Sequence, residues 1–254
     1  MNGRENTYVK QRAGAPSGFF ATEAAGLRWL AAASADGGVD VVEVLDQDAT
    51  SVTLERLDEA RPSDGVDAAA ARFGAALAAT HAAGAPTFGA LPPGASTYFF
   101  GPLDQPLTLP HVESATFGAF YTQARLRPVL ERTRLAGRDA DLAQRVCGAV
   151  ESGAVDTWGA SGEFVRPARV HGDLWSGNVL WTRGGAVVID PAACGHHPLA
   201  DLAMLTMFGA PGLEAILDSY AEAAHLPDDW REQHPAGADG LVEVTTDYPD
   251  FMPV

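Results

Sequence analysis

The sequence predicts an α+β fold of two unequal lobes, a small antiparallel sheet carrying one helix and a larger, mostly helical lobe. Three observations support this class. Strand-like runs cluster in the first 57 residues, helical periodicity dominates the remainder of the chain, and 254 residues with 46% hydrophobic composition can bury a sizeable core. We therefore divide the chain into a first lobe, 1–57, a second lobe, 58–234, and an irregular tail, 235–254.

The first lobe begins with a strand-like run, 7–9, that ends at Lys10. Residues 18–33 have the periodicity of a helix with one apolar face, and Glu23 falls on that face. A carboxylate on an apolar stripe is costly unless it is paired, so Lys10 is its expected partner. The alternative is a frayed terminal lysine and a glutamate at the solvent boundary.

The rest of the first lobe predicts two more strands. Residues 39–45 alternate as a half-buried strand, 46–49 have turn composition, and 51–54 form the returning strand. Together with 7–9 these segments predict a small antiparallel sheet on which the helix packs. The short stretch Glu55-Arg56-Leu57 then leads into the second lobe.

The second lobe is predicted to be mainly helical. A long Pro- and Gly-rich connection at 85–111 carries Tyr98-Phe99-Phe100, and such a connection inside a compact domain is often a binding loop. His81 is expected to be a packed helix histidine rather than a catalyst. The expected helices are 67–83, closed by Gly84, 114–133, interrupted near Pro128, 139–152, 199–208 and 213–224.

Residues 171–178 read His-Gly-Asp-Leu-Trp-Ser-Gly-Asn, and Asp190 comes after an apolar run twelve residues further on. The runs 178–181 and 186–189, separated by Arg183-Gly184-Gly185, predict a hairpin that carries Asn178 at its start and Asp190 at its end. The hairpin therefore folds two candidate magnesium ligands, an amide and a carboxylate, toward each other.

This spacing predicts a phosphoryl-transfer centre. Asp173 and Asn178 are five residues apart, as are the aspartate and asparagine of the protein-kinase catalytic loop, and Asp190 supplies the second carboxylate that such a centre requires. A match of the four fixed residues arises by chance in roughly one chain in 600 of this length. The alternative is a tight Asx-turn loop in which His171 and Asp173 bond only to local backbone groups.

The lone lysine supports the same chemistry. The chain has sixteen arginines and one lysine, Lys10. A compact ammonium can reach between phosphates where a planar guanidinium is too wide, so Lys10 is expected to contact the α- and β-phosphates of ATP. The two-lobed shape is then that of a protein kinase. Glu55 and Leu57 would form the hinge, whose backbone groups usually contact the adenine edge.

Charge and composition exclude several function classes. The formal charge of −16 and the pI near 4.6 argue against nucleic acid or an anionic membrane as partner. Cys147 and Cys194 are too few for a disulfide scaffold and lack metal-ligand spacing. No leader sequence or long apolar run is recognised, so we expect a cytoplasmic protein. The oligomeric state is open.

The octapeptide with Trp175-Ser176 at its centre resembles the fructosamine kinase family, also called ketosamine-3-kinases, within the aminoglycoside-phosphotransferase-like group. Further agreement comes from Ile189-Asp190-Pro191-Ala192 with Asp201-Leu202-Ala203-Met204, from Phe99-Phe100-Gly101-Pro102, and from Arg125-Leu126 with Pro128. The resemblance covers residues 8–232. It implies ATP-dependent phosphorylation of the 3-hydroxyl of a small-molecule or protein-bound ketosamine, which yields an unstable adduct and so reverses glycation.

The resemblance also implies residue roles. Asp173 would be the catalytic aspartate, and Asn178 and Asp190 would bind Mg²⁺. Lys10 would bind the phosphates and Glu23 would position it.

Trp175 would be a sugar platform, with His171 also on the substrate side. The alternative for Trp175 is a wedge packed inside the loop. Asp201 would brace the catalytic loop, unless it is only a helix cap.

Two competing functions stay open. One is another small-molecule kinase of the same fold, acting on an aminoglycoside, a choline-like amine or a sugar. The other is an inactive nucleotide-binding protein, because family members carry Gly-rich strands before the phosphate-binding lysine and only nine residues precede Lys10. We therefore expect a partial first lobe without those strands.

Overall fold

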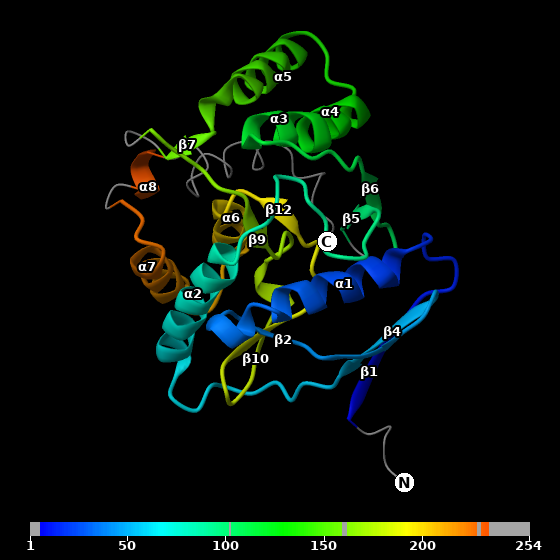
Figure 1. The fold of residues 1–254 in the computed structure, drawn as a ribbon, viewed down its shortest axis with the longest axis vertical. Helices are drawn as coiled ribbons and strands as arrows, with labels where there is room; N and C mark the ends of the chain where they lie inside the picture. The colour runs from blue at the N-terminus through cyan, green and yellow to red at the C-terminus, as the bar shows by residue number, and fades with distance from the viewer. Residues whose placement is uncertain (1–5, 102, 159–161, 228–229, 234–254) are drawn as a thin grey trace.

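A computed structural model of the chain describes residues 6–101, 103–158, 162–227 and 230–233. The predicted tail, 235–254, lies outside the described residues, as does Pro102. Figure 1 shows helix α1 crossing the middle of the molecule, with a small sheet on one side of it and the helices of the second lobe beyond. No helix of the described part is both long and apolar enough to cross a membrane.

The first lobe contains the predicted antiparallel sheet with one helix packed on it. Strands β1 (Thr7–Gln11), β4 (Ser51–Glu55) and β3 (Val44–Gln47) pair in the order β1-β4-β3. Helix α1 (Phe19–Ala31) covers this sheet. The core between them consists of buried apolar side chains, among them Phe20, Leu27, Val52 and Leu54. The helix is therefore held by its apolar face, the face that also carries Glu23.

The predicted strand 39–45 is divided in two, which corrects the sequence interpretation. Its fully buried valines are Val39 and Val42, and a spacing of three cannot place both on one face of a regular strand. The chain instead forms β2 (Asp40–Val41) and then β3, with a bulge between Val44 and Asp46. The predicted turn at 46–49 starts two residues late, since β3 continues to Gln47.

Strand β2 joins the predicted hairpin. The hairpin strands β10 (Val179–Trp181) and β11 (Ala186–Val188) are antiparallel, and β2 pairs with β11 in parallel. Val42 extends the pairing by donating its N–H to the carbonyl of Val188 at 3.1 Å. A strand of the first lobe therefore hydrogen-bonds directly to the segment that ends at Asp190.

The second lobe is mostly helical, as predicted. Helices α2 and α7 pack side by side over the hairpin, and α6 completes the same core (Figure 1). Helices α3, α4 and α5 form a layer of their own at the top of Figure 1. The helices are α2 (Val66–Ala82), α3 (Phe117–Tyr121), α4 (Arg127–Thr133), α5 (Arg138–Ala149), α6 (Leu199–Phe208), α7 (Leu213–Ala223) and α8 (Trp230–Gln233).

Two regions of the second lobe differ from the prediction. The connection 85–111 contains a hairpin of β5 (Tyr98–Phe100) and β6 (Leu107–Leu109). The helix predicted at 114–133 is interrupted not by a break at Pro128 but by a π-helical stretch, Thr122–Leu126, between α3 and α4. Proline lacks an N–H group and stands in the first turn of α4, where none is needed.

Short strands complete the second lobe. β9 (Ala168–Val170) pairs antiparallel with β12 (Cys194–His196), and β7 (Thr157–Trp158) pairs with β8 (Glu163–Phe164). A second π-helical stretch, Val150–Ala154, comes after α5. The pair of β9 and β12 matters most for the site, because the octapeptide 171–178 begins directly after β9. The domain boundary at residue 57 stays a prediction.

Candidate active site

The loop 171–178 connects β9 to the hairpin and is braced by Asp201 from the first turn of α6. The side chain of Asp201 is fully buried and accepts the backbone N–H groups of His171 at 2.8 Å and of Gly172 at 2.9 Å. His81 Nε2 lies 3.0 Å from the same carboxylate, and its Nδ1 lies 2.8 Å from the hydroxyl of Tyr220. Asp201 therefore braces the loop rather than capping its own helix.

Gly172 allows the loop to turn sharply. Its φ of +82° lies in the left-handed region, and a Cβ atom there would stand 2.1 Å from the carbonyl oxygen of Ala192. The backbone of the loop is thus pressed against the segment after Asp190. The backbone position of Asp173, the next residue, is consequently fixed both by the bonds to Asp201 and by the contact of Gly172 with Ala192.

Asn178 fastens the start of the hairpin to Asp173 and Asp190. Its Nδ2 group donates to the carbonyl oxygen of Asp173 at 2.7 Å, and lies 3.3 Å from the Asp173 carboxylate and 3.5 Å from the carbonyl of Asp190. The hairpin register pairs Val179 with Val188, which brings the flanking residues together. The predicted convergence of positions 173, 178 and 190 is therefore present.

Lys10 completes the cluster from the first lobe. Its Nζ lies 2.9 Å from Glu23 Oε2 and 3.1 Å from Asp190 Oδ1. The side chains of Lys10 and Glu23 are 12% and 6% exposed, whereas that of Asp190 is 38% exposed. The predicted ion pair of Lys10 with Glu23 is confirmed. The ammonium also faces Asp190, as expected if Lys10, Asp173, Asn178 and Asp190 form one centre.

Burial sets the protonation behaviour of this cluster. Burial raises the pKa of Glu23 to about 7, against the opposing effect of the Lys10 charge. Burial disfavours the ammonium of Lys10, but the nearby carboxylates of Glu23 and Asp190 raise its pKa above the ordinary value. Lys10 therefore stays cationic.

Asp173 is tuned toward proton transfer. Burial raises its pKa to about 6, the hydrogen bond from Asn178 opposes this shift, and the charge of Asp190 adds to it. A carboxylate of this kind is ionised at neutral pH, yet binds a proton more readily than a solvated aspartate does. This behaviour suits a group that accepts or orients a hydroxyl proton.

The donor set fits a hard divalent cation held jointly by protein and phosphate oxygens. The Asn178 Nδ2 group is engaged by carbonyl oxygens, so its Oδ1 atom is left as a ligand beside the half-exposed carboxylate of Asp190. The described residues contain no group of three or more His, Cys, Asp or Glu side chains that could hold a metal ion. Mg²⁺ is usually bound through one or two protein oxygens together with substrate phosphates, and Asn178 Oδ1 and the Asp190 carboxylate are oxygens of that kind.

The predicted substrate role of His171 is wrong for its side chain. His171 is 2% exposed, Nε2 donates to the carbonyl of Ile189 at 2.7 Å, and Nδ1 accepts the N–H of Asp173 at 3.3 Å. Burial lowers the pKa of His171, so the imidazole is neutral, in agreement with one donor and one acceptor nitrogen. His171 therefore links the Asp173 loop to the hairpin and does not face a substrate.

Trp175 is 40% exposed and lies beside the exposed ring of Phe208, with ring centroids 6.0 Å apart. A Cβ atom on Gly177 would meet the Trp175 indole at 2.1 Å, so the glycine backbone supports one face of the ring. An aromatic surface in this position is available to a ligand, which a wedge buried inside the loop would not be. The substrate role of Trp175 stays a prediction.

The hinge residues lie at the end of the small sheet. Leu57 packs against the apolar cluster of the first lobe, which Val187 and Ile189 of the hairpin also contact. The side chain of Glu55 accepts the backbone N–H of Glu43 at 2.9 Å. Apolar side chains from both lobes therefore meet here, and the adenine role of Glu55 and Leu57 stays a prediction.

Two contacts of the site escaped the sequence analysis. The bracing of the loop by Asp201 was expected, but the contact of His81 with that carboxylate was missed, although a histidine on the core face of a helix calls for a buried polar partner. Arg125 was noted only as part of the resemblance. Its guanidinium stacks on Tyr98, and that ring lies close enough to Asp173 for the carboxylate to affect its pKa.

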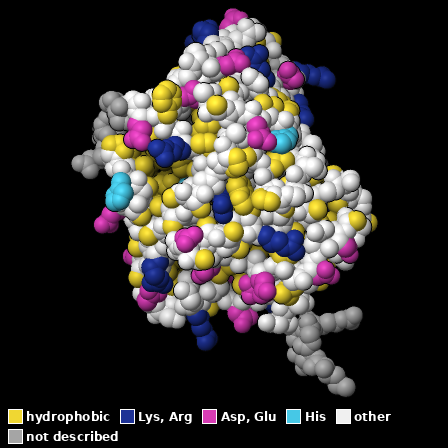
Figure 2. Space-filling model, in the orientation of Figure 1, with side chains coloured by type: hydrophobic (Ala, Val, Ile, Leu, Met, Phe, Trp, Pro, Cys, Tyr) yellow, Lys and Arg dark blue, Asp and Glu magenta, His cyan; other side chains and the backbone are white. Residues whose placement is uncertain are grey.

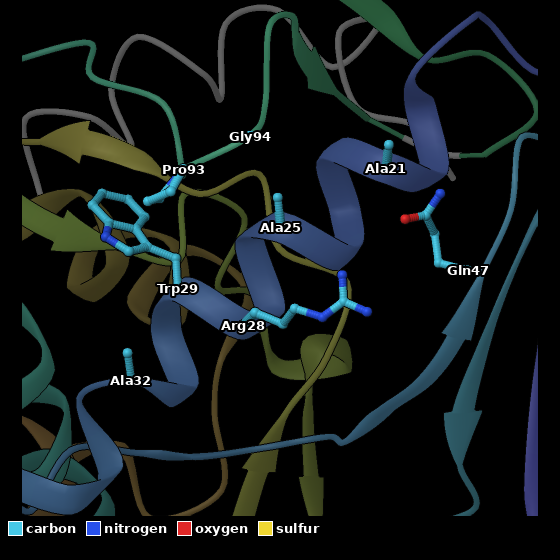
Figure 3. A pocket seen from close by; sticks show the side chains of 8 residues that line it. All are labelled: Ala21, Ala25, Arg28, Trp29, Ala32, Gln47, Pro93 and Gly94. Carbon is cyan, nitrogen blue, oxygen red and sulfur yellow. The ribbon is translucent and has the colours of Figure 1, made fainter.

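A separate depression lies away from this cluster. It has a volume of about 400 Å³ and is lined by one face of α1 with Gln47, Pro93 and Gly94 (Figure 3). The helix residues there are Ala21, Ala25, Arg28, Trp29 and Ala32. They lie on the side of α1 opposite Glu23, so this depression is not part of the candidate active site.

Comparisons with known proteins agree with this geometry. The sequence model described as "Fructosamine kinase" matches residues 1–236. An inferred fructosamine-3-kinase of known structure from Thermobifida fusca is 36% identical, with a TM-score of 0.73 over 94% of this chain and 82% of that chain. A macrolide 2'-phosphotransferase from Brachybacterium faecium is 17% identical, with a TM-score of 0.55 over 96% of this chain and 76% of that one, which shows the shared fold alone.

Curated relatives match over a shorter stretch. The ketosamine-3-kinase of Mus musculus is 33% identical over 90 residues, which are 35% of this chain and 28% of that protein. The first of the other curated relatives are likewise matched over 26% to 35% of their length. The two-lobed architecture predicted from the sequence is that of the kinase-like phosphotransferases found by structural similarity.

Proposed function

Because the chain belongs to the fructosamine kinase family, we propose that it is an ATP-dependent kinase that phosphorylates the 3-hydroxyl of a ketosamine. One observation carries the proposal. The ammonium of Lys10 bridges Glu23 and Asp190 at 2.9 and 3.1 Å, and Asn178 ties Asp190 to Asp173. A cation that can bind phosphate, a candidate metal ligand and a candidate base, which are Lys10, Asp190 and Asp173, thus meet at one place.

The roles of the residues depend on their positions. Lys10 binds the phosphates of ATP through its point charge, and buried Glu23 holds the ammonium in place. Asp173 accepts and orients the hydroxyl proton of the acceptor. Asn178 and Asp190 hold Mg²⁺, which neutralises phosphate charge when it is bound. Asp201 keeps the backbone of the Asp173 loop fixed.

The fixed positions matter because phosphoryl transfer needs little covalent chemistry from the protein. Most of the acceleration comes from alignment and from charges that need no rearrangement during the reaction. The brace on His171 and Gly172 and the Asn178 link to Asp173 supply that rigidity. The phosphorylated ketosamine then decomposes, so the activity removes sugar from an amine. We propose a cytoplasmic enzyme whose partner is the ketosamine and not nucleic acid or a membrane.

The test is a phosphorylation screen with ATP and Mg²⁺. Fructoselysine is compared with fructose, an aminoglycoside and choline, and the phosphorylated position is assigned by phosphorus and proton NMR. We expect turnover of fructoselysine at the 3-hydroxyl. Turnover of another acceptor in its place would assign the chain to a different small-molecule kinase of the same fold. Nucleotide-induced thermal stabilisation without consumption of ATP on any acceptor would indicate an inactive nucleotide-binding protein.

A further inference from the structure

Arg125 lies in a setting that a purely structural arginine does not need. It belongs to the π-helical stretch Thr122–Leu126, one of two such stretches in the described residues. Single π-helical turns within α-helices are rare and are frequent at functional sites. Here the stretch directs the side chain of Arg125 toward the β5 hairpin and β12.

Two aromatic rings hold the guanidinium. Its Cζ atom lies 3.8 Å from the centre of the Tyr98 ring and 4.8 Å from the centre of the Phe120 ring. Nη1 donates to the carbonyl of Ala124 at 3.1 Å, and Nη2 lies 3.8 Å from the sulfur of Cys194. Aromatic faces thus fix the plane of the cation, while its hydrogen-bonding edge has only weak or local acceptors.

Within the part of the chain that the structure describes, no carboxylate forms an ion pair with this cation. Among the described residues no Asp or Glu oxygen lies within 4.0 Å of the guanidinium of Arg125. The arginines that do form ion pairs are on the surface: Arg72, Arg127 and Arg231 are 52%, 54% and 42% exposed. Arginine stays charged in proteins, and the aromatic faces and the Ala124 carbonyl compensate only part of the solvation that this partly buried cation loses, because none of them is an anion.

The absence of a partner is unexpected in a chain with 33 acidic and 17 basic side chains. On the face shown in Figure 2, acidic and basic side chains are interspersed over apolar patches. A chain with a net charge of −16 repels anions in general, so an anionic substrate group would need a local cation. Arg125 is such a cation.

Arg125 is placed next to the loop that carries Asp173. Cys194 on β12 is in register with Val170 on β9, three residues before Asp173. Tyr98 belongs to the same apolar cluster as Val170 and Cys194, and it is also within electrostatic reach of Asp173. The ring that supports the guanidinium therefore belongs to the cluster that packs under the start of the Asp173 loop, which places Arg125 in the neighbourhood of the proposed base.

We propose that Arg125 binds a carboxylate of the acceptor, so that the preferred substrates are ketosamines of free amino acids. This inference rests on the proposed function, since it names the acceptor class for that same site. In the adduct of an α-amino acid the carboxylate is two bonds from the amine that carries the sugar. A planar guanidinium can donate two parallel hydrogen bonds to it, a geometry that neither a neutral amide nor a sugar hydroxyl reproduces.

The experiment compares two substrates that differ by one charge, the fructose adducts of glycine and of glycinamide. For the wild-type protein with ATP and Mg²⁺, kcat/KM should be roughly 10- to 100-fold higher for the glycine adduct, the range expected of hydrogen bonds to a charged group. In Arg125→Gln and Arg125→Lys this ratio should fall toward one. The control Arg127→Gln removes an exposed cation two residues away and should keep the wild-type ratio.

Several results would overturn the subsite. Equal kcat/KM for both adducts in the wild type would do so, as would Arg125 variants that slow both adducts and leave the ratio unchanged. The latter result would mean that the guanidinium of Arg125 serves to pack the fold or to bind the transferred phosphoryl group, and not to bind the carboxylate of the acceptor. Thermal melts identify a variant that does not fold, and the wild-type ratio alone then decides.

Calorimetric titration of both adducts without ATP separates this inference from the proposed function. If the wild type phosphorylates neither adduct but binds the glycine adduct at least 10-fold more tightly, and Arg125→Lys loses that preference, the proposed function fails and the carboxylate subsite stands. If neither adduct is turned over and neither is bound with such a preference, both fail.

Discussion

Replacing Asp201 by asparagine tests whether the loop 171–178 depends on one buried carboxylate. Asp201 is 0% exposed and accepts the N–H groups of His171 and Gly172, with His81 on the same carboxylate. Asparagine keeps the size of the side chain but offers one oxygen and an NH₂ group. One backbone N–H of the loop would then face a donor instead of an acceptor, without water to replace the lost bond.

The magnitude can be worked out from these contacts. Loss of a charged acceptor removes roughly 1.5–3 kcal/mol per hydrogen bond, and an orphaned buried donor costs a further ~1–3 kcal/mol. We expect Asp201→Asn to lower the free energy of unfolding by about 3–5 kcal/mol. For a chain of this size that corresponds to a fall in Tm of roughly 6–20 °C.

The assay is urea unfolding monitored by tryptophan fluorescence, together with calorimetry, at neutral pH. The control Asp218→Asn alters an exposed ion pair with Arg231 and should change the free energy of unfolding by less than about 0.5 kcal/mol. A loss below about 1 kcal/mol in Asp201→Asn, similar to the control, would refute the brace.

The pH dependence gives a second readout of the same variant. Burial opposes ionisation of Asp201, but the bonds from His81 and the loop lower its pKa overall. A lowered pKa in the folded state means that the carboxylate stabilises the fold above the unfolded value of about 3.9, and that this is lost as pH falls through the folded value. The wild type should therefore lose stability below about pH 4 more steeply than Asp201→Asn. Parallel acid unfolding curves would contradict the assignment.

Three further residues, Asp173, Lys10 and Gly172, give predictions about the proposed chemistry and the loop. Asp173→Asn should lower kcat by roughly 10²- to 10⁴-fold while the thermal shift induced by ATP persists, and near-normal turnover would exclude Asp173 as the base. Since burial raises the pKa of Asp173 to about 6 and the ionised form is the active one, kcat/KM should fall as pH decreases through that range; a rate that is flat down to pH 5 would contradict it. Lys10→Arg should weaken ATP binding about 10-fold or more in calorimetric titration, because the ammonium fits between two carboxylates at 2.9 and 3.1 Å, and unchanged affinity would make the lone lysine incidental. Gly172→Ala should destabilise the protein by roughly 2 kcal/mol or more in urea unfolding, since its Cβ would overlap the carbonyl of Ala192; Gly184→Ala, at an open position, is the control, and equal effects would argue against the close approach.

The convergence of Asp173, Asn178 and Asp190 could be predicted because its determinants are local in sequence. The spacing from Asp173 to Asn178 and the two short runs before Asp190 specify a loop and a hairpin, and hairpin geometry brings their ends together. The partnership of Lys10 and Glu23 could also be inferred, since a carboxylate on an apolar helix face demands a cation and the chain has one lysine.

The remaining contacts depend on packing between distant segments. Nothing in the run 39–45 indicates that its first half pairs with β11 rather than with β4. The burial of His171 depends on the position of the Ile189 carbonyl, and the setting of Arg125 depends on Tyr98 and Phe120. Such contacts have no periodic signature, because the partners are many residues apart and their register is set by the whole core.

The pairing of β2 with β11 limits how the two halves of the protein can move. In a two-lobed enzyme, opening is commonly a rotation about the connecting segment, here Glu55 to Leu57. The hydrogen bonds from Asp40 to Val42 add a second attachment, next to Asp190. Two attachments define an axis rather than a free pivot, so nucleotide admission should proceed by a twist of the small sheet about that axis. Asp190 lies close to the axis and would move little during such a twist.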